Sequence, residues 1–304
     1  GHSRPQGATL INGRWPYDDN DVNHCDAKAR ANSVGTPAIP EYFRATSQGL
    51  TQAMLTAKPY PIKAGLIVGS NPLLSWPDSQ QVKQAFEQLD FLAVSELFMT
   101  PTALMADIVF PAASFMEYQG ISQGQDGSIH YQEAMTQVGE AKADIQIIAE
   151  IGHAMGVMPV YDEDLFWQQA LSPSPISFQQ LKQQGSLLQT HDQSATISYH
   201  SHGFPTASTK VELYSERLAK LGLDPLPIYR PNLPVTEQYP LRVTTAKPRH
   251  YMFSHGRQIN ALRQAHPIPL VRIHPELADE FGLNQGDLAA IETAPNKVIY
   301  QTVQ

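Results

Sequence analysis

Cysteine is almost absent from this chain, since Cys25 is the single cysteine among 304 residues. One cysteine excludes an internal disulfide, a zinc site built only from cysteines, and a complete set of iron–sulfur ligands within the chain. The apolar runs are also short, because residues 64–68 and 108–115 fall far below the roughly 18 to 20 residues that cross a bilayer. We therefore expect no membrane span.

Basic residues are few and scattered. The chain has 21 Lys and Arg against 29 Asp and Glu, a formal net charge of −8, and no basic run. Nucleic-acid binding requires clustered cations that neutralise phosphates, so the composition argues against a nucleic-acid partner. The sequence also lacks Walker and His-Glu-x-x-His motifs. His24 with Cys25, and His200 with His202, have no further ligands at metal-site spacing.

Three short apolar stretches predict a parallel sheet. Residues 64–68, 91–94 and 108–110 are continuous apolar runs, and helical patterns separate them, one at about 79–89 behind Asp78 and a short one behind Thr100. Alternating strands and helices are typical of a parallel sheet whose two faces are covered. Residues 120–127 then read as a Gly-rich loop, and further helices are predicted at 47–57, 144–155, 165–171, 178–184 and 211–221.

A proline-rich stretch near residues 225–234 predicts a stiff linker between two domains. Strand patterns at 241–245, 270–273 and 288–293, with a helix at 276–281, indicate that the domain after it is β-rich. We predict an irregular connecting segment at 1–60, an α/β domain with a helical and loop extension at 61–235, and a partial β-rich domain at 236–304.

Polar residues follow two of the predicted strands, where open α/β sheets bind ligands. Gly69, Ser70 and Asn71 come after the first strand, and Ser95 with Glu96 ends the second. A glycine lets a ligand approach the backbone, and Asn71 could hydrogen-bond a base or a ribose. The carboxylate of Glu96 could accept paired hydrogen bonds from a guanine edge or from ribose hydroxyls. The alternatives are an ordinary turn at Asn71 and a solvated loop acid at Glu96.

Two other features have simpler interpretations beside functional ones. Asp144 precedes an amphipathic pattern and, on its own, is interpreted as a helix cap. A basic cluster in an otherwise acidic chain suits a phosphate or pyrophosphate, because Arg and Lys form charge-assisted hydrogen bonds, although a solvated basic loop is the alternative. Its members are Lys247, Arg249, His250, His255 and Arg257.

Several motifs occur together in a fixed order. They are GLIVGSNP at 65–72, FMTPTA at 98–103, ADIVFPA at 106–112, EYQG at 117–120, GEAKAD at 139–144, TASTKVELY at 206–214, YPL at 239–241 and IHPELA at 273–278. In order and spacing this set resembles the molybdopterin oxidoreductases of the dimethyl sulfoxide reductase family, from about residue 60 to the end.

This resemblance implies an α/β, parallel-sheet dinucleotide-binding domain followed by a double-psi-barrel-like domain, which together bind bis(molybdopterin guanine dinucleotide) with molybdenum or tungsten. It implies that Asn71 and Ser75 touch the dinucleotide, that Ser95 and Glu96 hold its nucleoside end, and that Asp144 meets a guanine. Near the other side of the cofactor it places Lys247, His250, Ser254, His255 and Asn260.

The chain also departs from the family. The cysteine motif for a four-iron cluster and the metal ligand belong to the N-terminal half in that family, and neither is present here. We expect the C-terminal portion of a catalytic subunit, truncated at both ends and inactive alone. The expected setting is a bacterial or archaeal complex that is periplasmic or membrane-associated, with a cytoplasmic setting as the alternative. Its expected partners are a small-molecule substrate, an iron–sulfur electron-transfer subunit and a membrane anchor subunit.

The resemblance implies a respiratory reductase of an S- or N-oxide or oxyanion, with formate dehydrogenase next. One alternative is a non-catalytic electron-transfer scaffold like the large iron–sulfur subunit of complex I, and another is a hydratase on the same cofactor. The joint retention of Asn71, Ser95, Glu96 and Asp144 favours a bound dinucleotide over a scaffold, which would be free to lose them.

Overall fold

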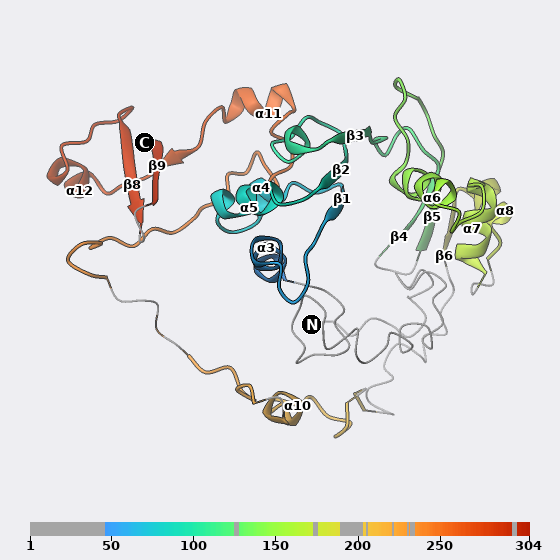
Figure 1. Cartoon of the computed structure of the whole chain (residues 1–304), viewed down its shortest axis with the longest axis horizontal. Coiled ribbons are helices and arrows are strands. Elements are labelled where there is room, and N and C mark those ends of the chain that lie inside the picture. Colours follow the sequence, from blue (N-terminus) through green and yellow to red (C-terminus); the bar gives the residue numbers. More distant parts are fainter. Residues whose placement is uncertain are drawn as a thin grey trace. The chain divides into compact units, whose positions relative to one another are not determined.

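The chain divides into two compact units, Gly1–Leu226 and Pro227–Gln304. The computed structural model describes residues 46–124, 128–172, 176–188, 203–204, 206–220, 222–229, 231, 235–293 and 297–304 (Figure 1). The division falls between Pro225 and Pro227, within the proline-rich stretch. Most of the segment predicted to be irregular, with Cys25 and His24, lies outside the described residues, as do His200 and His202.

Unit 1 contains the predicted parallel sheet. Its strands are β1 (Ala64–Val68), β2 (Phe91–Glu96) and β3 (Ile108–Pro111), in the order β1-β2-β3. Val68 pairs with Ser95, and Ser95 pairs with Phe110, so all three strands end at the same edge. β2 is central and its residues 92–95 are buried, as expected for a strand covered on both faces.

Local signals start and stop the elements around this sheet. Gly69 ends β1 at a φ of +56°, a left-handed conformation that favours glycine, and Pro72 opens the short helix α4 (Pro72–Ser75). Asp78 caps α5 (Ser79–Phe86) as predicted, with its carboxylate accepting from the Gln81 N–H at 3.3 Å. The helix ends at Phe86 and not at residue 89, because the chain must turn before it enters β2.

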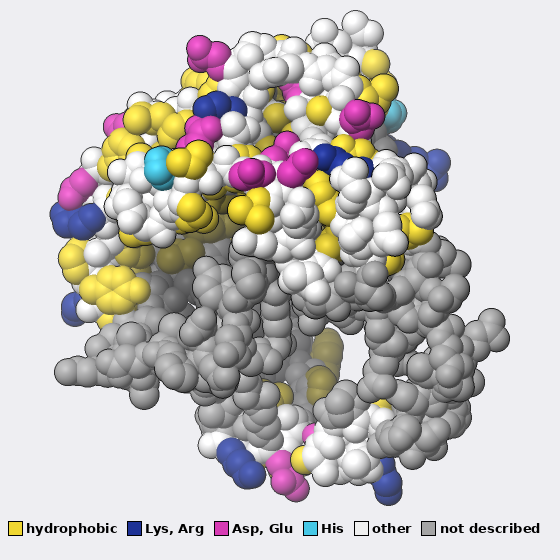
Figure 2. All heavy atoms as spheres, turned by 90° about the vertical axis from the view of Figure 1, so that its right-hand side faces the viewer, with side chains coloured by type: hydrophobic (Ala, Val, Ile, Leu, Met, Phe, Trp, Pro, Cys, Tyr) yellow, Lys and Arg dark blue, Asp and Glu magenta, His cyan; other side chains and the backbone are white. Residues whose placement is uncertain are grey.

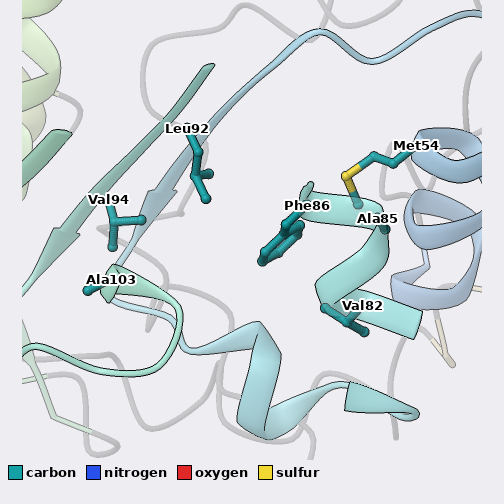
Figure 3. Packing of buried hydrophobic residues seen from close by; sticks show 7 residues of the cluster. All are labelled: Met54, Val82, Ala85, Phe86, Leu92, Val94 and Ala103. Carbon is teal, nitrogen blue, oxygen red and sulfur yellow. The ribbon is translucent and has the colours of Figure 1, made fainter. Parts of the chain in front are cut away.

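A compact apolar cluster holds the helices against the sheet (Figure 3). In that view Leu92 and Val94 come from the central strand, Val82 and Phe86 come from α5, and Met54 comes from α3 (Ser47–Thr56). Phe86 also meets Trp76 edge-on, with ring centroids 6.3 Å apart. The sheet end of unit 1 is therefore supported by buried side chains from elements far apart in the sequence.

The rest of unit 1 contains a second sheet that the sequence did not predict. Strands β4 (Gly120–Gln123), β5 (Ser128–Gln132) and β6 (Ser186–Leu188) pair antiparallel in the order β4-β5-β6. The interpretation of 120–127 as a Gly-rich loop was wrong for residues 120–123. Glycine in a strand is indistinguishable from glycine in a loop until its partner strand is known.

The same part of unit 1 contains three helices, namely α6 (Asp144–Ala154), α7 (Glu163–Leu171) and α8 (Phe178–Gln184). The last begins with a capping box, in which Ser177 and Gln180 satisfy each other's backbone N–H groups. A second cluster of buried side chains joins α7 and α8 to β5, and it consists of Ile129, Leu171, Phe178 and Leu181. The predicted helices at 144–155, 165–171 and 178–184 are therefore confirmed within a few residues.

The predicted helix at 211–221 is shorter than expected. Only α10 (Glu216–Lys220) forms, while Val211 and Leu213 are exposed and not helical. An amphipathic pattern forms a stable helix only where its apolar face packs, and these side chains have no core to enter. None of the helices in the described part of the chain combines the length and apolar character of a bilayer span.

Unit 2 contains one small mixed sheet. Its strands are β7 (Leu270–Val271), β8 (Leu288–Thr293) and β9 (Lys297–Val303), in the order β7-β9-β8. β8 and β9 form an antiparallel hairpin, and β7 pairs parallel to β9. Two helices accompany it, α11 (Asn260–Ala265) and α12 (Pro275–Glu280).

Several expectations for unit 2 change. The strand predicted at 241–245 is extended chain without sheet pairing, because an alternating pattern cannot supply a partner strand. Strand β9 and helix α11 were missed. The double-psi-barrel-like form stays a prediction, since the described strands of this unit form a single three-stranded sheet.

The core of unit 1 gives a matched test of burial. Leu92 on β2 is 3% exposed and Leu104 is 69% exposed. We expect Leu92→Ala to lower the free energy of unfolding by about 3 kcal/mol, from lost apolar burial and the cavity left behind. Leu104→Ala should change it by less than about 0.5 kcal/mol. Urea unfolding followed by circular dichroism measures both, and equal losses would contradict this assignment of the core.

Candidate functional site

The candidate site of unit 1 lies where the parallel strands end. The N–H of Gly69 donates to the carbonyl of Ser95 at 3.0 Å, which extends the pairing of β1 and β2 to the edge. Gly69 and Ser70 are both exposed at this edge, and no atom lies within 4 Å of the position that a Cβ of Gly69 would take. The backbone of Gly69 is therefore open to a ligand.

Ser95 and Asp144 form the polar contact that joins this edge to α6. Ser95 is completely buried, and its hydroxyl donates to Asp144 Oδ1 at 2.7 Å. Asp144 is partly buried, so its carboxylate lies at the border between the interior and solvent. One carboxylate oxygen is thereby held by the protein, and Oδ2 has no hydrogen-bond partner within the described residues and can accept from a ligand.

The sequence interpretation of Asp144 as a helix cap was wrong. Ala143 occupies the N-cap position of α6, and Asp144 is the first residue of the helix, with no capping hydrogen bond from its side chain. The backbone of Lys142 fixes the location of Asp144, because it forms two hydrogen bonds to the chain at and just after the end of β3. The Lys142 N–H donates to the Pro111 carbonyl at 3.0 Å, and the Ala113 N–H donates to the Lys142 carbonyl at 2.8 Å.

Glu96, the last residue of β2, adds a second carboxylate at this edge. Its Oε1 accepts the N–H of Leu97 at 2.8 Å, and the side chain is partly exposed. Within the described residues Oε2 has no hydrogen-bond partner. Glu96 therefore presents an oriented carboxylate with one oxygen available as an acceptor.

Asn71 lies after β1, and its carboxamide is held by a residue that the sequence analysis did not select. Thr102 donates its hydroxyl to Asn71 Oδ1 at 2.7 Å, and the Leu73 N–H donates to the Thr102 hydroxyl oxygen at 3.2 Å. Asn71 is 8% exposed and Thr102 is completely buried. Ser75, also predicted, is exposed and donates to the backbone carbonyl of Asn71 at 3.0 Å.

The predicted residues of unit 2 gather in one loop and the start of α11. Lys247 lies over the ring of Phe253 at 3.8 Å, and the ring of His250 stacks on His266 with centroids 5.8 Å apart. Ser254 is partly buried, whereas His255 and Asn260 are exposed. Two members of the basic cluster, Lys247 and His250, thus pack against aromatic rings of the same unit.

A cavity of about 830 Å³ lies in unit 2 beside this loop. Its lining combines many apolar side chains with cationic ones, among them Lys247, Arg242 and Arg272, and Glu292 is its acidic member. Arg257 lies over the ring of Tyr251 at 5.0 Å, and its buried Nε has no hydrogen-bond partner among the described residues. Such a lining suits an anionic ligand with an apolar part.

A second cavity, of about 1160 Å³, lies in unit 1 between the end of β3, the β4–β5 hairpin and helix α6. Sequence reasoning did not find it, because its walls come from segments spread over residues 110–182, among them parts of the motifs at 106–112, 117–120 and 139–144, and only the fold brings them together. Figure 2 faces this part of the molecule and shows acidic side chains next to basic ones near the middle of the described surface. One of its acids, Glu163, is partly buried, and burial raises the pKa of its carboxyl group.

The described residues contain no group of three or more His, Cys, Asp or Glu side chains that could hold a metal ion. The chemistry available at the strand-end edge is therefore hydrogen bonding, with carboxylate acceptors at Glu96 and Asp144 and the carboxamide of Asn71. This combination suits a ligand that has both N–H or O–H donors and oxygen acceptors, such as a nucleotide.

Comparisons with known proteins agree on one family. The family model for molybdopterin oxidoreductase matches residues 19–154. The acetylene hydratase of Syntrophotalea acetylenica is 30% identical over 281 residues, which is 84% of this chain and 37% of the hydratase. The assimilatory nitrate reductase catalytic subunit of Bacillus subtilis is 28% identical over 251 residues, which is 76% of this chain and 34% of that protein.

A solved structure agrees with this result. Acetylene hydratase from Pelobacter acetylenicus superposes with a TM-score of 0.75 at 29% sequence identity, covering 86% of this chain and 38% of the hydratase. The mixed α/β fold with its parallel sheet is therefore shared with that enzyme. The chain spans a little more than a third of the length of the relatives it matches.

The raised pKa of Glu163 predicts a pH dependence of stability. Burial is the main cause, so the folded protein holds the proton above the ordinary value of 4.5 and loses stability as pH rises from there through the folded pKa. Glu163→Gln removes this titration. We expect the variant to gain stability relative to wild type between pH 4 and pH 7, by less than about 1 kcal/mol because solvent screens a partly exposed group.

Urea unfolding at both pH values measures this difference, with Glu133→Gln as the control at an exposed acid of the same cavity. A gap between wild type and Glu163→Gln that stays constant with pH would contradict the raised pKa.

Proposed function

The chain belongs to the molybdopterin oxidoreductases of the dimethyl sulfoxide reductase family, and from that premise we propose that it is part of the catalytic subunit of a molybdenum or tungsten enzyme. Its cofactor in this proposal is bis(molybdopterin guanine dinucleotide). The observation that carries the proposal is the partly buried hydrogen bond from Ser95 to Asp144 at the ends of the parallel strands.

The residues present fit a guanine nucleotide. Guanine offers N–H donors on one edge, and carboxylates accept such hydrogen bonds in pairs. Asp144 is oriented by Ser95, and Glu96 is oriented by the backbone of Leu97, so both present oxygens at the strand ends. In the proposal Asp144 meets the guanine and Glu96 holds the nucleoside end, while the fully buried Ser95 contributes through Asp144.

Other predicted residues would hold the remaining parts of the cofactor. The exposed backbone of Gly69 and Ser70 allows close approach, and Asn71 with Ser75 would touch the dinucleotide. Lys247, His250, Ser254, His255 and Asn260 would lie near its other side, where cationic groups favour phosphate oxygens. A double-psi-barrel-like form of the second domain is part of this proposal.

When bound, such a cofactor supplies two-electron redox chemistry at the metal, and the protein supplies binding, orientation and electrostatics. We propose reduction of an S- or N-oxide or oxyanion as the reaction, with formate oxidation as the next choice. The similarity to an assimilatory nitrate reductase catalytic subunit supports reduction of an oxyanion. The word "subunit" in the name of that relative supports a multi-subunit enzyme. As part of the proposal, the partners are an iron–sulfur electron-transfer subunit and a membrane anchor subunit, in a bacterial or archaeal complex that is periplasmic or membrane-associated, with a cytoplasmic setting as the alternative.

Hydration is the second candidate reaction. The acetylene hydratase of Syntrophotalea acetylenica matches this chain at 30% identity, so a related chain serves a reaction of a different class in that relative. An assay with reduced viologen dye on the natural protein distinguishes reduction from hydration. A reductase oxidises the dye when nitrate or trimethylamine N-oxide is added, whereas a hydratase consumes no electrons.

Metal and pterin analysis of the natural protein tests the cofactor class. We expect about one molybdenum or tungsten atom and about two pterins per chain, because a bis-pterin cofactor supplies both. Elemental mass spectrometry and the fluorescence of the oxidised pterin give these values. Well-folded protein with neither metal nor pterin would contradict the proposal and favour an electron-transfer scaffold.

The two carboxylates give a residue-level test. Glu96→Ala and Asp144→Ala should each lower the pterin content of the natural protein, since guanine donors left unpaired cost about 1 to 3 kcal/mol. Glu87→Ala, at an exposed acid after α5, is the control and should keep wild-type content. Wild-type pterin content in both site variants would exclude these carboxylates from the binding site.

A further inference from the structure

The capping of helix α4 is unusual. Asn71 occupies its N-cap position, where an asparagine side chain ordinarily accepts a hydrogen bond from the second or third N–H of the helix. Asn71 makes no such bond. The second N–H, that of Leu73, donates instead to the hydroxyl of Thr102, which comes from a segment 29 residues further along the chain. Thr102 thus caps α4 in place of Asn71 and leaves the carboxamide free for another use.

The same hydroxyl also fixes which way the carboxamide faces. A threonine hydroxyl has one proton to donate and two lone pairs, and one lone pair of Thr102 already accepts from Leu73. Because Thr102 is completely buried, its proton needs an acceptor, and Asn71 Oδ1 is that acceptor at 2.7 Å. The oxygen of the amide therefore faces Thr102, and the NH₂ group faces away from it.

The NH₂ group of Asn71 has no hydrogen-bond partner among the described residues. Among the described residues, the fully buried side-chain polar atoms without a partner are Trp167 Nε1 and Arg257 Nε. The NH₂ nitrogen of Asn71 is therefore not fully buried. Asn71 thus keeps a small exposed fraction at the strand-end edge, with its donors available there.

We propose that Thr102 is a positioning residue that holds Asn71 with its NH₂ group toward the ligand. Asn71 then donates to an oxygen acceptor, such as a phosphate or carbonyl oxygen, while Glu96 and Asp144 accept from donors of the ligand. The inference rests on the proposed function, since the ligand is the nucleotide part of the proposed cofactor. Thr102 itself does not touch the ligand, because its hydroxyl is used by Leu73 and Asn71.

Pterin content per folded chain of the natural protein is the first measurement. We expect Thr102→Val, which keeps the shape and loses the hydroxyl, to lower it about tenfold, and Thr102→Ser to keep it near the wild-type value. Asn71→Asp separates acceptance of the Thr102 proton from donation to the ligand. Aspartate can still accept from the hydroxyl of Thr102 but cannot donate, so it should lower the content like Thr102→Val.

A double variant shows whether Thr102 acts through Asn71. In an Asn71→Ala background, Thr102→Val should cause no further loss, because the group that it positions is already absent. Independent losses that multiply would overturn the inference, as would wild-type pterin content in Thr102→Val. Wild-type protein without pterin contradicts the proposed function, whereas wild-type pterin content in every variant contradicts the roles of Thr102 and Asn71 and leaves the cofactor class in place.

A measurement on cofactor-free protein tests the inference whether or not the wild-type protein contains pterin. In protein with ¹³C-labelled asparagine side chains, the Cγ resonance of Asn71 reports the hydrogen bond accepted by Oδ1. We expect Thr102→Val to shift this resonance and Thr102→Ser to leave it in place. An unchanged Asn71 resonance in Thr102→Val would overturn the inference whatever the cofactor content is.

Discussion

Parallel pairing of β1, β2 and β3 is the constraint on which the candidate site of unit 1 depends. Parallel strands joined by crossovers of one hand must all end at the same edge, so residues that follow different strands become neighbours there. Ser95 and Asp144 are 49 residues apart in the sequence and share a hydrogen bond of 2.7 Å. The apolar cluster around Leu92 and Val94 stabilises this pairing, and the core therefore fixes the positions of the polar residues at the edge.

Two buried hydroxyls give the edge its hydrogen-bond polarity. Ser95 and Thr102 are both completely buried, and each donates its proton to the side chain of a residue nearer the surface. A buried hydroxyl whose proton lacks an acceptor costs free energy, so each hydroxyl restrains its partner to one orientation. Asp144 is thereby held as an acceptor, and the carboxamide of Asn71 is held as a donor. The polarity of the surface is set from the interior, by groups that a ligand does not reach.

Sequence patterns predicted the elements but not these contacts. The strand at 288–293 and the helix at 178–184 form at the predicted residues, because strong local periodicity and caps determine both. The hairpin of β4 and β5 and the unpaired stretch at 241–245 were misread, since pairing depends on a partner elsewhere in the chain. Asp144 was read as a cap because an acid at a helix start gives the same local signal whether it caps the helix or meets a distant hydroxyl. Thr102 lies in the motif at 98–103, but nothing in that motif indicates its role, because the contact exists only once the fold brings Thr102 to Asn71, 31 residues earlier in the chain.

The relatives also separate cofactor binding from the choice of reaction. By their names, one relative hydrates acetylene and another reduces nitrate, and each matches at least three quarters of this chain at similar identity. Features common to this chain and both relatives do not decide between hydration and reduction. In the proposed function, hydrogen bonding at the strand-end edge serves the cofactor and not a particular substrate. A variant at this edge then changes how much cofactor is held and does not decide the reaction, which is assigned by measuring whether turnover consumes electrons.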